Sequence, residues 1–179
     1  MEFKTVRESK VVMSILMLPS HSNFSGKIHG GFILSLLDQI AFASASKFSG
    51  NYCVTASVDT VDFLCPIEVG ELVTLKACVN YVGKTSMTIG IRVEAENIQT
   101  GKVNHCNSSY FSMVAKDKNG KPTPVPGLII KTKEDMKRFW NAIKRREQRK
   151  DIQIHEEEFN PNSQKIKEVI LGYNVKFDL

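Results

Sequence analysis

The 179-residue sequence predicts an α+β fold in which an antiparallel sheet of about five strands wraps around one long buried helix. Two observations predict this arrangement. Residues 32–48 read as a helix whose apolar side chains leave no broad polar face, which is typical of a helix buried on most sides. Stretches rich in β-branched and apolar side chains flank it, at residues 9–18, 53–64, 71–82, 85–98 and 103–116.

The connections between the expected strands carry turn-forming residues, which supports their boundaries. The first strand stops at Pro19, and Gly83-Lys84 and Gln99-Thr100-Gly101-Lys102 separate later strands. From Met87 to Ala95, apolar side chains alternate with polar or small ones. One face of this strand is therefore expected to be buried and the other exposed to water.

The folded domain is expected to span residues 1–127. A strong turn signal at residues 117–122 is followed by spaced prolines before Gly127, which is typical of an extended exit from a domain. Residues 128–179 are then a basic C-terminal helical extension, to which the sequence assigns no role. A helix is expected to begin near Thr132, and the apolar stripe by which it should dock comprises Met136, Phe139, Trp140 and Ile143.

The net charge of +5 is unevenly distributed along the chain. Residues 131–150 hold nine basic and three acidic side chains, whereas residues 1–130 are nearly balanced. A basic helix, and not a basic protein, therefore accounts for the excess charge. This distribution argues against nucleic acid as the partner.

Neither a signal peptide nor a membrane span is expected. The best apolar candidate is divided by Asp38 and several serines, and it falls short of the roughly 18 to 20 residues that a span needs. A cytoplasmic protein with no membrane partner is therefore expected. The four cysteines lie far apart, without a Cys-x-x-Cys pair or a histidine at ligand spacing. They are interpreted as core thiols, with no metal site and no disulfide framework.

Asp38 is the only carboxylate in the apolar helix, and it has two explanations. It is a mediocre helix former that pays a desolvation cost if it is ionised and unpaired. In the structural explanation, it faces a wet groove or hydrogen-bonds Ser35 or Ser44. In the functional explanation, a partly apolar pocket raises the pKa of Asp38 so that it acts as a base.

Gly30 and Gly31 stand where this helix begins. Glycines leave the backbone N–H groups uncovered, and a helix N-terminus presents unpaired donors at its positive dipole end. Such an end can hold an anion or a developing oxyanion, although a glycine pair by itself more often marks a tight turn. These donors and Asp38 are roughly 10 Å apart by helical rise, so one acyl group can touch both along a groove or through water.

Three motifs occur in order within about residues 10–127. They are Asn23-x-x-Gly26-x-x-His29-Gly30-Gly31 followed by Asp38, then Val58-Asp59-x-Val61-Asp62-Phe63-Leu64-x-Pro66-x-x-x-Gly70, and then Gly83-Lys84-Thr85-Ser86-Met87. In this order they resemble the acyl-CoA thioesterases of the hot-dog superfamily, in the branch that contains bacterial acyl-CoA hydrolases and the cytosolic brain-type acyl-CoA hydrolase. The resemblance implies the hot-dog fold, which is the arrangement of sheet and helix expected above.

The resemblance also implies an activity, the hydrolysis of a fatty acyl-CoA to a free acid and coenzyme A. It implies that Asp38 is the general base or nucleophile, that Asn23 holds water or substrate, and that the Gly30-Gly31 helix start, Gly31 in particular, polarises the thioester carbonyl. No metal or cofactor is implied, since coenzyme A is part of the substrate. A homodimer is the implied minimum, in which Asn23 of one subunit faces Asp38 of the other, and such dimers often gather into hexamers as trimers of dimers.

Further residues are assigned to substrate binding. Lys84, with Thr85 and Ser86 beside it, is the first candidate to hold the phosphates of coenzyme A, and its alternative is a solvated hairpin lysine. His29 and Gly30 are expected to shape the site. His29 is interpreted as a packing or capping residue without a role in proton transfer.

Other functions remain open at this stage. Hydration or dehydration of an acyl thioester is a distant second, because those hot-dog enzymes resemble one another in pairing a histidine with a carboxylate, and here the matching loop offers Asn23. A ligand-sensing or nucleic-acid-binding module would use the basic cluster Lys144-Arg145-Arg146 with Arg149-Lys150. That cluster is interpreted as a solvated face or an assembly element.

Overall fold

The computed structural model describes residues 2–157, 163–171 and 173. Its contacts divide the chain into two compact units, Met1–Ala142 and Ile143–Leu179. The first unit contains the sheet, the central helix and the first turns of a long helix, and it carries the sites described below. Among the described helices, none is both long enough and apolar enough to cross a lipid bilayer.

A five-stranded antiparallel sheet forms the body of the first unit, as the sequence predicts. Its strands are ordered β2-β4-β5-β6-β3. Their bounds are β2 Val11–Leu16, β3 Tyr52–Phe63, β4 Leu72–Val82, β5 Ser86–Asn97 and β6 Lys102–Lys116. Strand β3 lies at one edge and pairs only with β6 among the described residues, with register shifts between Thr55 and Ser57 and between Val58 and Val61.

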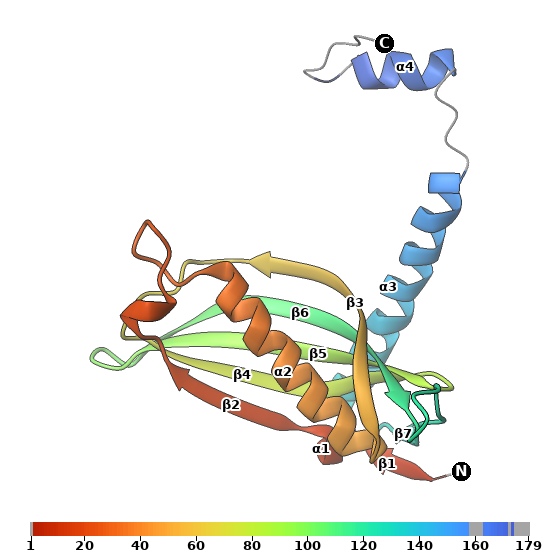
Figure 1. Cartoon of the computed structure of the whole chain (residues 1–179), viewed down its shortest axis with the longest axis horizontal. Helices are drawn as coiled ribbons and strands as arrows, with labels where there is room; N and C mark the ends of the chain where they lie inside the picture. Colours follow the sequence, from red (N-terminus) through yellow and green to blue (C-terminus); the bar gives the residue numbers. More distant parts are fainter. Residues whose placement is uncertain (1, 158–162, 172, 174–179) are drawn as a thin grey trace. The chain divides into compact units, whose positions relative to one another are not determined.

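Helix α2, Gly30–Ser49, runs along one face of this sheet (Figure 1). Its apolar residues follow the helical period, and Gly50, in the left-handed region at φ 71°, ends it. One face is buried against the sheet, through Ile33, Leu36, Leu37, Ile40, Ala41, Ser44, Ala45, Phe48 and Ser49. The opposite face, which includes Leu34, Asp38 and Phe42, is exposed. The prediction of a helix buried on most sides is therefore wrong for a single chain, in which only one face is covered.

Two short strands, one near the N-terminus and one after the five-stranded sheet, form a separate parallel pair within the first unit. Strand β1, Phe3–Thr5, pairs with β7, Gly127–Ile129, and helix α1, Val6–Ser9, follows β1. Residue 127, the expected end of the domain, thus lies at the start of a strand inside the first unit. A Cβ on Gly127 would come within 2.4 Å of the Phe3 ring, so a side chain there would require the exposed Phe3 side chain to shift.

Helix α3, Lys133–Glu157, begins as predicted after a Thr132 cap, whose Oγ1 accepts a hydrogen bond from the Asp135 N–H at 3.0 Å. Its first turns pack on the sheet: the Phe139 and Tyr81 rings lie 5.2 Å apart, and Ala142 is buried. Of the predicted docking stripe, Met136 and Trp140 are more than half exposed instead. The compact unit therefore extends to Ala142, beyond the expected boundary. The second unit contains the rest of α3 and helix α4, Gln164–Leu171.

Candidate active site

Asp38 lies on the exposed face of α2, opposite strand β3. The Thr55 hydroxyl on β3 donates a hydrogen bond of 2.5 Å to Asp38 Oδ1. The two serines considered from the sequence have other partners, since Ser35 Oγ bonds to Gln39 and Ser44 Oγ donates to the Ser9 carbonyl. Of the alternatives in the structural explanation, Asp38 does lie at an exposed groove, but its hydrogen-bond partner is a strand residue and not a helix serine.

A cavity of about 620 Å³ adjoins this pair. It is lined by Asp38, Gln39, Phe42, Tyr52, Cys53, Val54, Thr55 and Met113. The Phe42 and Tyr52 rings meet edge to face, with centroids 5.5 Å apart, and give the cavity an aromatic wall. An acid at the edge of a largely apolar hollow is an arrangement typical of a binding site for an apolar ligand with one reactive group.

His29 caps the N-terminus of α2, as interpreted from the sequence. Its Nδ1 accepts a hydrogen bond of 2.9 Å from the Gly31 N–H, and its ring lies so close that a Cβ on Gly31 would come within 2.7 Å of Cε1. The Gly31 N–H, which was expected to face the substrate, is thus already paired. The Gly30 N–H has no intrahelical acceptor by position and no partner in the described part of the chain.

Asn23 organises its own loop. Its Oδ1 accepts hydrogen bonds from Ser25 N, Ser25 Oγ and Lys27 N at 2.9, 2.8 and 3.2 Å, which is the pattern of an Asx turn. Asn23 nevertheless borders a second cavity of about 410 Å³, together with Gly30, Phe63 and Cys65. This cavity brings two of the predicted site residues, Asn23 and Gly30, to one place.

The structure does not bring Asn23 and Asp38 together within one chain. They border different cavities, one at the start of α2 and one at its middle. This separation is compatible with the expectation that the two residues meet across subunits, which stays a prediction.

Lys84, Thr85 and Ser86 border neither of these cavities. They form the turn between β4 and β5, where their carbonyl groups accept hydrogen bonds from Val125, Ala115 and Gly83 at 3.1, 3.0 and 2.7 Å. The Lys84 side chain is exposed. The role of this turn in holding coenzyme A therefore stays a prediction.

Thr55 is the site residue that the sequence analysis missed. A signal was present, because Thr55 follows Cys53 by two positions and so shares its strand face, and Cys53 is buried. A polar side chain two residues from a buried one, opposite the helix that carries the lone acid, could have been recognised as its partner. The sequence does not disclose how the two elements align.

Three of the cysteines are buried and Cys65 is partly exposed, all as free thiols. The described residues contain no group of three or more potential metal ligands. Two thiols that are far apart in the sequence nevertheless meet: Cys65 Sγ and Cys106 Sγ lie 2.8 Å apart. The sequence analysis gave no indication of this contact.

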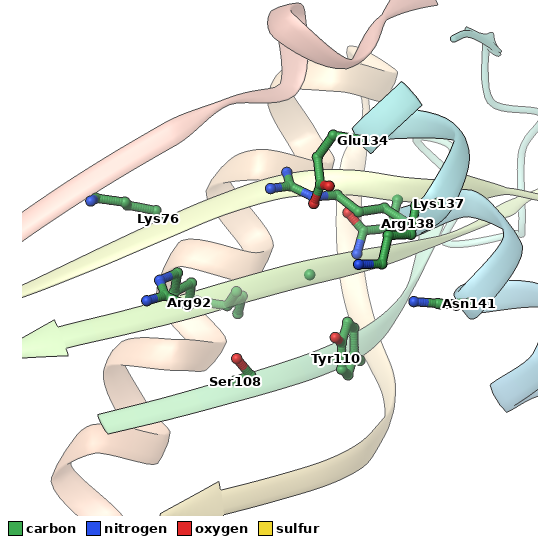
Figure 2. A pocket seen from close by; sticks show the side chains of 11 residues that line it. Lys76, Arg92, Ser108, Tyr110, Glu134, Lys137, Arg138 and Asn141 are labelled. Atoms are coloured by element: carbon green, nitrogen blue, oxygen red, sulfur yellow. The ribbon is translucent and has the colours of Figure 1, made fainter. Parts of the chain in front are cut away.

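The outer face of the sheet carries a third hollow, of about 260 Å³, between strands β4 to β6 and the first turns of α3 (Figure 2). Its labelled side chains are Lys76, Arg92, Ser108, Tyr110, Glu134, Lys137, Arg138 and Asn141. Most of its cations are paired: Lys76 and Arg92 with Glu94 at 2.5 and 2.7 Å, and Arg138 with Glu134 at 2.9 Å. The face is therefore less positive than its lysines and arginines indicate.

Comparisons with known proteins agree with this geometry. Residues 25–102 match the profile described as Thioesterase superfamily. The chain is 45% identical over 145 residues to Protein VdlD of Helicobacter pylori, covering 81% of this chain and 83% of that one. It is 36% identical to a protein of Bacillus subtilis named uncharacterized acyl-CoA thioester hydrolase YkhA, covering 86% and 90%.

Solved structures share the fold. An apo-hexameric acyl-CoA thioesterase has a TM-score of 0.82 at 36% identity, covering 84% of this chain and 97% of that one. An acyl-CoA hydrolase from Staphylococcus aureus, in complex with butyryl coenzyme A and coenzyme A, has a TM-score of 0.80 at 32% identity, covering 87% and 95%. Alanine variants of that enzyme at an asparagine, an aspartate and a threonine have also been solved.

Those three positions are fifteen and seventeen residues apart in the Staphylococcus aureus sequence. The same residue types stand here at the same spacing, as Asn23, Asp38 and Thr55. The chain belongs to the thioesterase superfamily, in the branch of acyl-CoA thioester hydrolases with the hot-dog fold.

Proposed function

We propose that this protein hydrolyses acyl-CoA thioesters to a free acid and coenzyme A. The observation that carries the proposal is the Asp38 carboxylate, fixed by Thr55 at the mouth of a cavity with an aromatic wall. The cavity suits an acyl chain, and the Asp38 carboxylate lies beside the position that the reacting carbonyl group would take. The names of the relatives of similar length support the same activity.

In the proposed reaction, Asp38 either removes a proton from an attacking water molecule or attacks the thioester carbonyl carbon itself. Thr55 occupies Oδ1, which leaves Oδ2 to face the reaction. The C–S bond then breaks, and coenzyme A departs as a thiolate. If Asp38 is the nucleophile, this leaves an anhydride between Asp38 and the acyl group, which a water molecule hydrolyses to release the free acid and restore Asp38. Because a thiolate is a good leaving group, the reaction needs no dedicated general acid.

The start of α2 is the proposed site for the negative charge that develops on the carbonyl oxygen. Within it, we assign the Gly30 N–H as the donor, because the Gly31 N–H already bonds to His29. Asn23 shares the cavity with Gly30 and can position water or substrate there. His29 holds the helix start in place and does not transfer protons.

We further propose that the complete site forms between two copies of the chain. The exposed face of α2 carries Leu34 and Phe42, and the neighbouring β3 region carries Val58, Phe63 and Leu64, all at least 38% exposed. Apolar side chains gathered on two adjacent elements favour a covered face. A second copy would bring its Asn23 and Gly30 to this Asp38. Hexameric relatives support a trimer of such dimers.

Lys84 remains the proposed contact for the phosphates of coenzyme A, with Thr85 and Ser86 beside it. Its exposed ammonium group lies at the tip of the β4–β5 turn, where a second copy could present substrate to it. A cytoplasmic location belongs to the same proposal. It is supported by the name of the rat relative, a cytosolic acyl coenzyme A thioester hydrolase, which is 32% identical over 140 residues.

The test is release of coenzyme A thiol from a panel of acyl-CoAs by the wild type, Asp38→Ala, Asp38→Asn and Asn23→Ala. Loss of a general base typically costs a factor of about 100 or more, so both Asp38 variants should lose at least that much in kcat. Asp117→Asn, which changes an exposed carboxylate in the turn after β6 and keeps the Oδ1 acceptor of that turn, is the matched control and should hydrolyse at the wild-type rate. A folded Asp38→Ala protein with nearly wild-type activity would overturn the proposal.

A further inference from the structure

Cys65 and Cys106 form a pair of thiols at the wall of the cavity that contains Asn23. Their sulfur atoms lie 2.8 Å apart, although forty-one positions separate them in the sequence. The pairing of β3 with β6 brings them together: the Leu64 N–H donates to the Cys106 carbonyl at 2.9 Å, so Cys65 stands one residue past the point of contact. Strand β6 thus supplies one thiol, and the connection that follows β3 supplies the other.

The two thiols differ in access. Cys65 is partly exposed and borders the cavity, whereas Cys106 is completely buried. Burial, and the contact with the neighbouring Cys65 thiol, raise the pKa of the Cys106 thiol to about 12. Cys106 is therefore protonated at neutral pH and shielded from reagents. Any attack from solution must begin at Cys65.

The two sulfurs lie close to bonding distance. A disulfide requires a sulfur separation of about 2.05 Å, so the atoms need to approach by only ~0.8 Å. Strand β3 ends at Phe63, and Cys65 follows in the connection that leads to Pro66. A residue outside the ladder can shift by this amount without breaking the pairing of β3 with β6.

We propose that Cys65 and Cys106 are a redox-active dithiol, which a small-molecule disulfide oxidises to an intramolecular disulfide. The Cys65 thiolate attacks one sulfur of the reagent, a mixed disulfide forms, and the first small thiolate leaves. Cys106 then attacks the Cys65 sulfur and gives up its proton to the second small thiolate, which leaves as a thiol. Two protein thiols and one small disulfide become one protein disulfide and two small thiols, and two electrons pass to the reagent.

The chain provides an internal control in Cys78. This thiol is buried, its sulfur accepts a hydrogen bond from Arg138 Nη1 at 3.4 Å, and no second cysteine contacts it in the described part of the chain. Burial raises the pKa of Cys78 as well. Cys78 thus shares the burial and the raised pKa of Cys106 but lacks a partner thiol. A difference in reactivity between Cys106 and Cys78 therefore reports the effect of the contact with Cys65.

The experiment treats the reduced full chain with bis(2-hydroxyethyl) disulfide and follows the products by intact mass and peptide mapping. The wild type should lose two hydrogens and yield a Cys65–Cys106 cross-link, and Cys78→Ser should behave identically. Cys106→Ser, or Cys106→Ala if the serine disturbs the core, should stop at a mixed disulfide on Cys65. Cys65→Ser should leave Cys106 as a free thiol.

A wild type in which Cys65 reacts no faster than Cys78, or forms only a mixed disulfide, would overturn the proposed dithiol.

A second experiment uses coenzyme A disulfide as the oxidant. It rests on the proposed function, because the cavity must admit coenzyme A. Oxidation at least about tenfold faster than by the hydroxyethyl reagent at equal concentration is expected, as bound substrates gain from proximity. If only the hydroxyethyl reagent oxidises the pair, the dithiol stands and coenzyme A does not reach this cavity.

Discussion

Thr55 and Asp38 are the pair of residues on which the proposed chemistry depends. A charge-assisted hydrogen bond of 2.5 Å fixes the orientation of the carboxylate and leaves one oxygen for the reaction. Its origin is a meeting of helix and strand: Thr55 lies opposite α2 because β3 begins directly after that helix and turns back along it. A hydroxyl group at this point is therefore required, and a methyl group would not replace it.

Thr55→Ala should lower kcat by about 10- to 100-fold, the range that corresponds to the loss of a hydrogen bond to a charged group. Thr55→Ser keeps the hydroxyl and should retain most of the activity. The measurement is a kcat and KM series for both variants with one acyl-CoA. Equal decreases of kcat in Thr55→Ala and Thr55→Ser would indicate that Thr55 acts through packing and not through its hydroxyl group.

Contacts between individual side chains were the features least predictable from the sequence. Asp38 was recognisable as a lone acid in an apolar helix, but its partner Thr55 is seventeen positions away and depends on how β3 lies against α2. Likewise, the glycine pair indicated available N–H groups, and only the rotamer of His29 reveals that the Gly31 N–H is taken. Contacts of this kind depend on tertiary placement, which no local pattern encodes.

At the scale of elements, periodicity and turn residues predicted nearly all of the sheet. The stretches expected at 53–64 and 103–116 correspond to Tyr52–Phe63 and Lys102–Lys116. The pairing of β1 with β7 was missed, because three-residue strands are too short to show an alternation and their ends are far apart in the sequence. Patterns in the local sequence therefore predicted the long strands of the sheet but not the short strands β1 and β7.

Strands β4 and β5 are also joined on their outer face by Glu94, which pairs with Arg92 on its own strand and with Lys76 across the ladder. The hydrogen bonds from Arg92 and Lys76 lower the pKa of Glu94 below its ordinary value of 4.5. The pKa of Glu94 is therefore lower in the folded state than in the unfolded state. Its interactions with Arg92 and Lys76 stabilise the folded protein at pH values above the ordinary pKa of the carboxyl group. This stabilisation disappears as the pH falls through the lowered pKa.

Glu94→Gln should therefore reduce the free energy of unfolding at pH 7, and the difference from the wild type should shrink as the pH falls below 4.5. Urea unfolding at pH 7, 5 and 3.5 measures it. Glu96→Gln, on the same strand but without an ion pair in the described part of the chain, is the control. A difference that is the same at all three pH values would contradict the ion-pair explanation.

At the scale of the whole molecule, a single chain contains the parts of the proposed site but not their assembly. Asn23 and Gly30 border one cavity, and Asp38 and Thr55 border another. The sequence resemblance implied that a partner closes this gap. A two-fold axis that brings one half-site of each copy against the other half-site of its partner would create two equivalent sites per dimer.

This arrangement predicts complementation between inactive variants. Asn23→Ala and Asp38→Ala are each expected to be inactive, but in a mixed dimer one of the two sites combines an intact Asn23 with an intact Asp38. Unfolding and refolding an equimolar mixture should restore about a quarter of the wild-type activity, since half of the dimers are mixed and each has one intact site. The measurement is thiol release before and after mixing.

Two Asp38→Ala preparations with different affinity tags, mixed in the same way, are the control and should stay inactive. If the Asn23→Ala and Asp38→Ala mixture also stays inactive while tagged chains exchange, the site lies within one subunit.

The position of β3 at the sheet edge has a consequence for the life of the protein before assembly. Among the described residues, this twelve-residue strand pairs with another strand on one side only, and it carries exposed apolar side chains. Such an edge is a template for any extended polypeptide that it meets. A newly synthesised chain is therefore most prone to aggregation while it is alone, and slow assembly should favour precipitation over function.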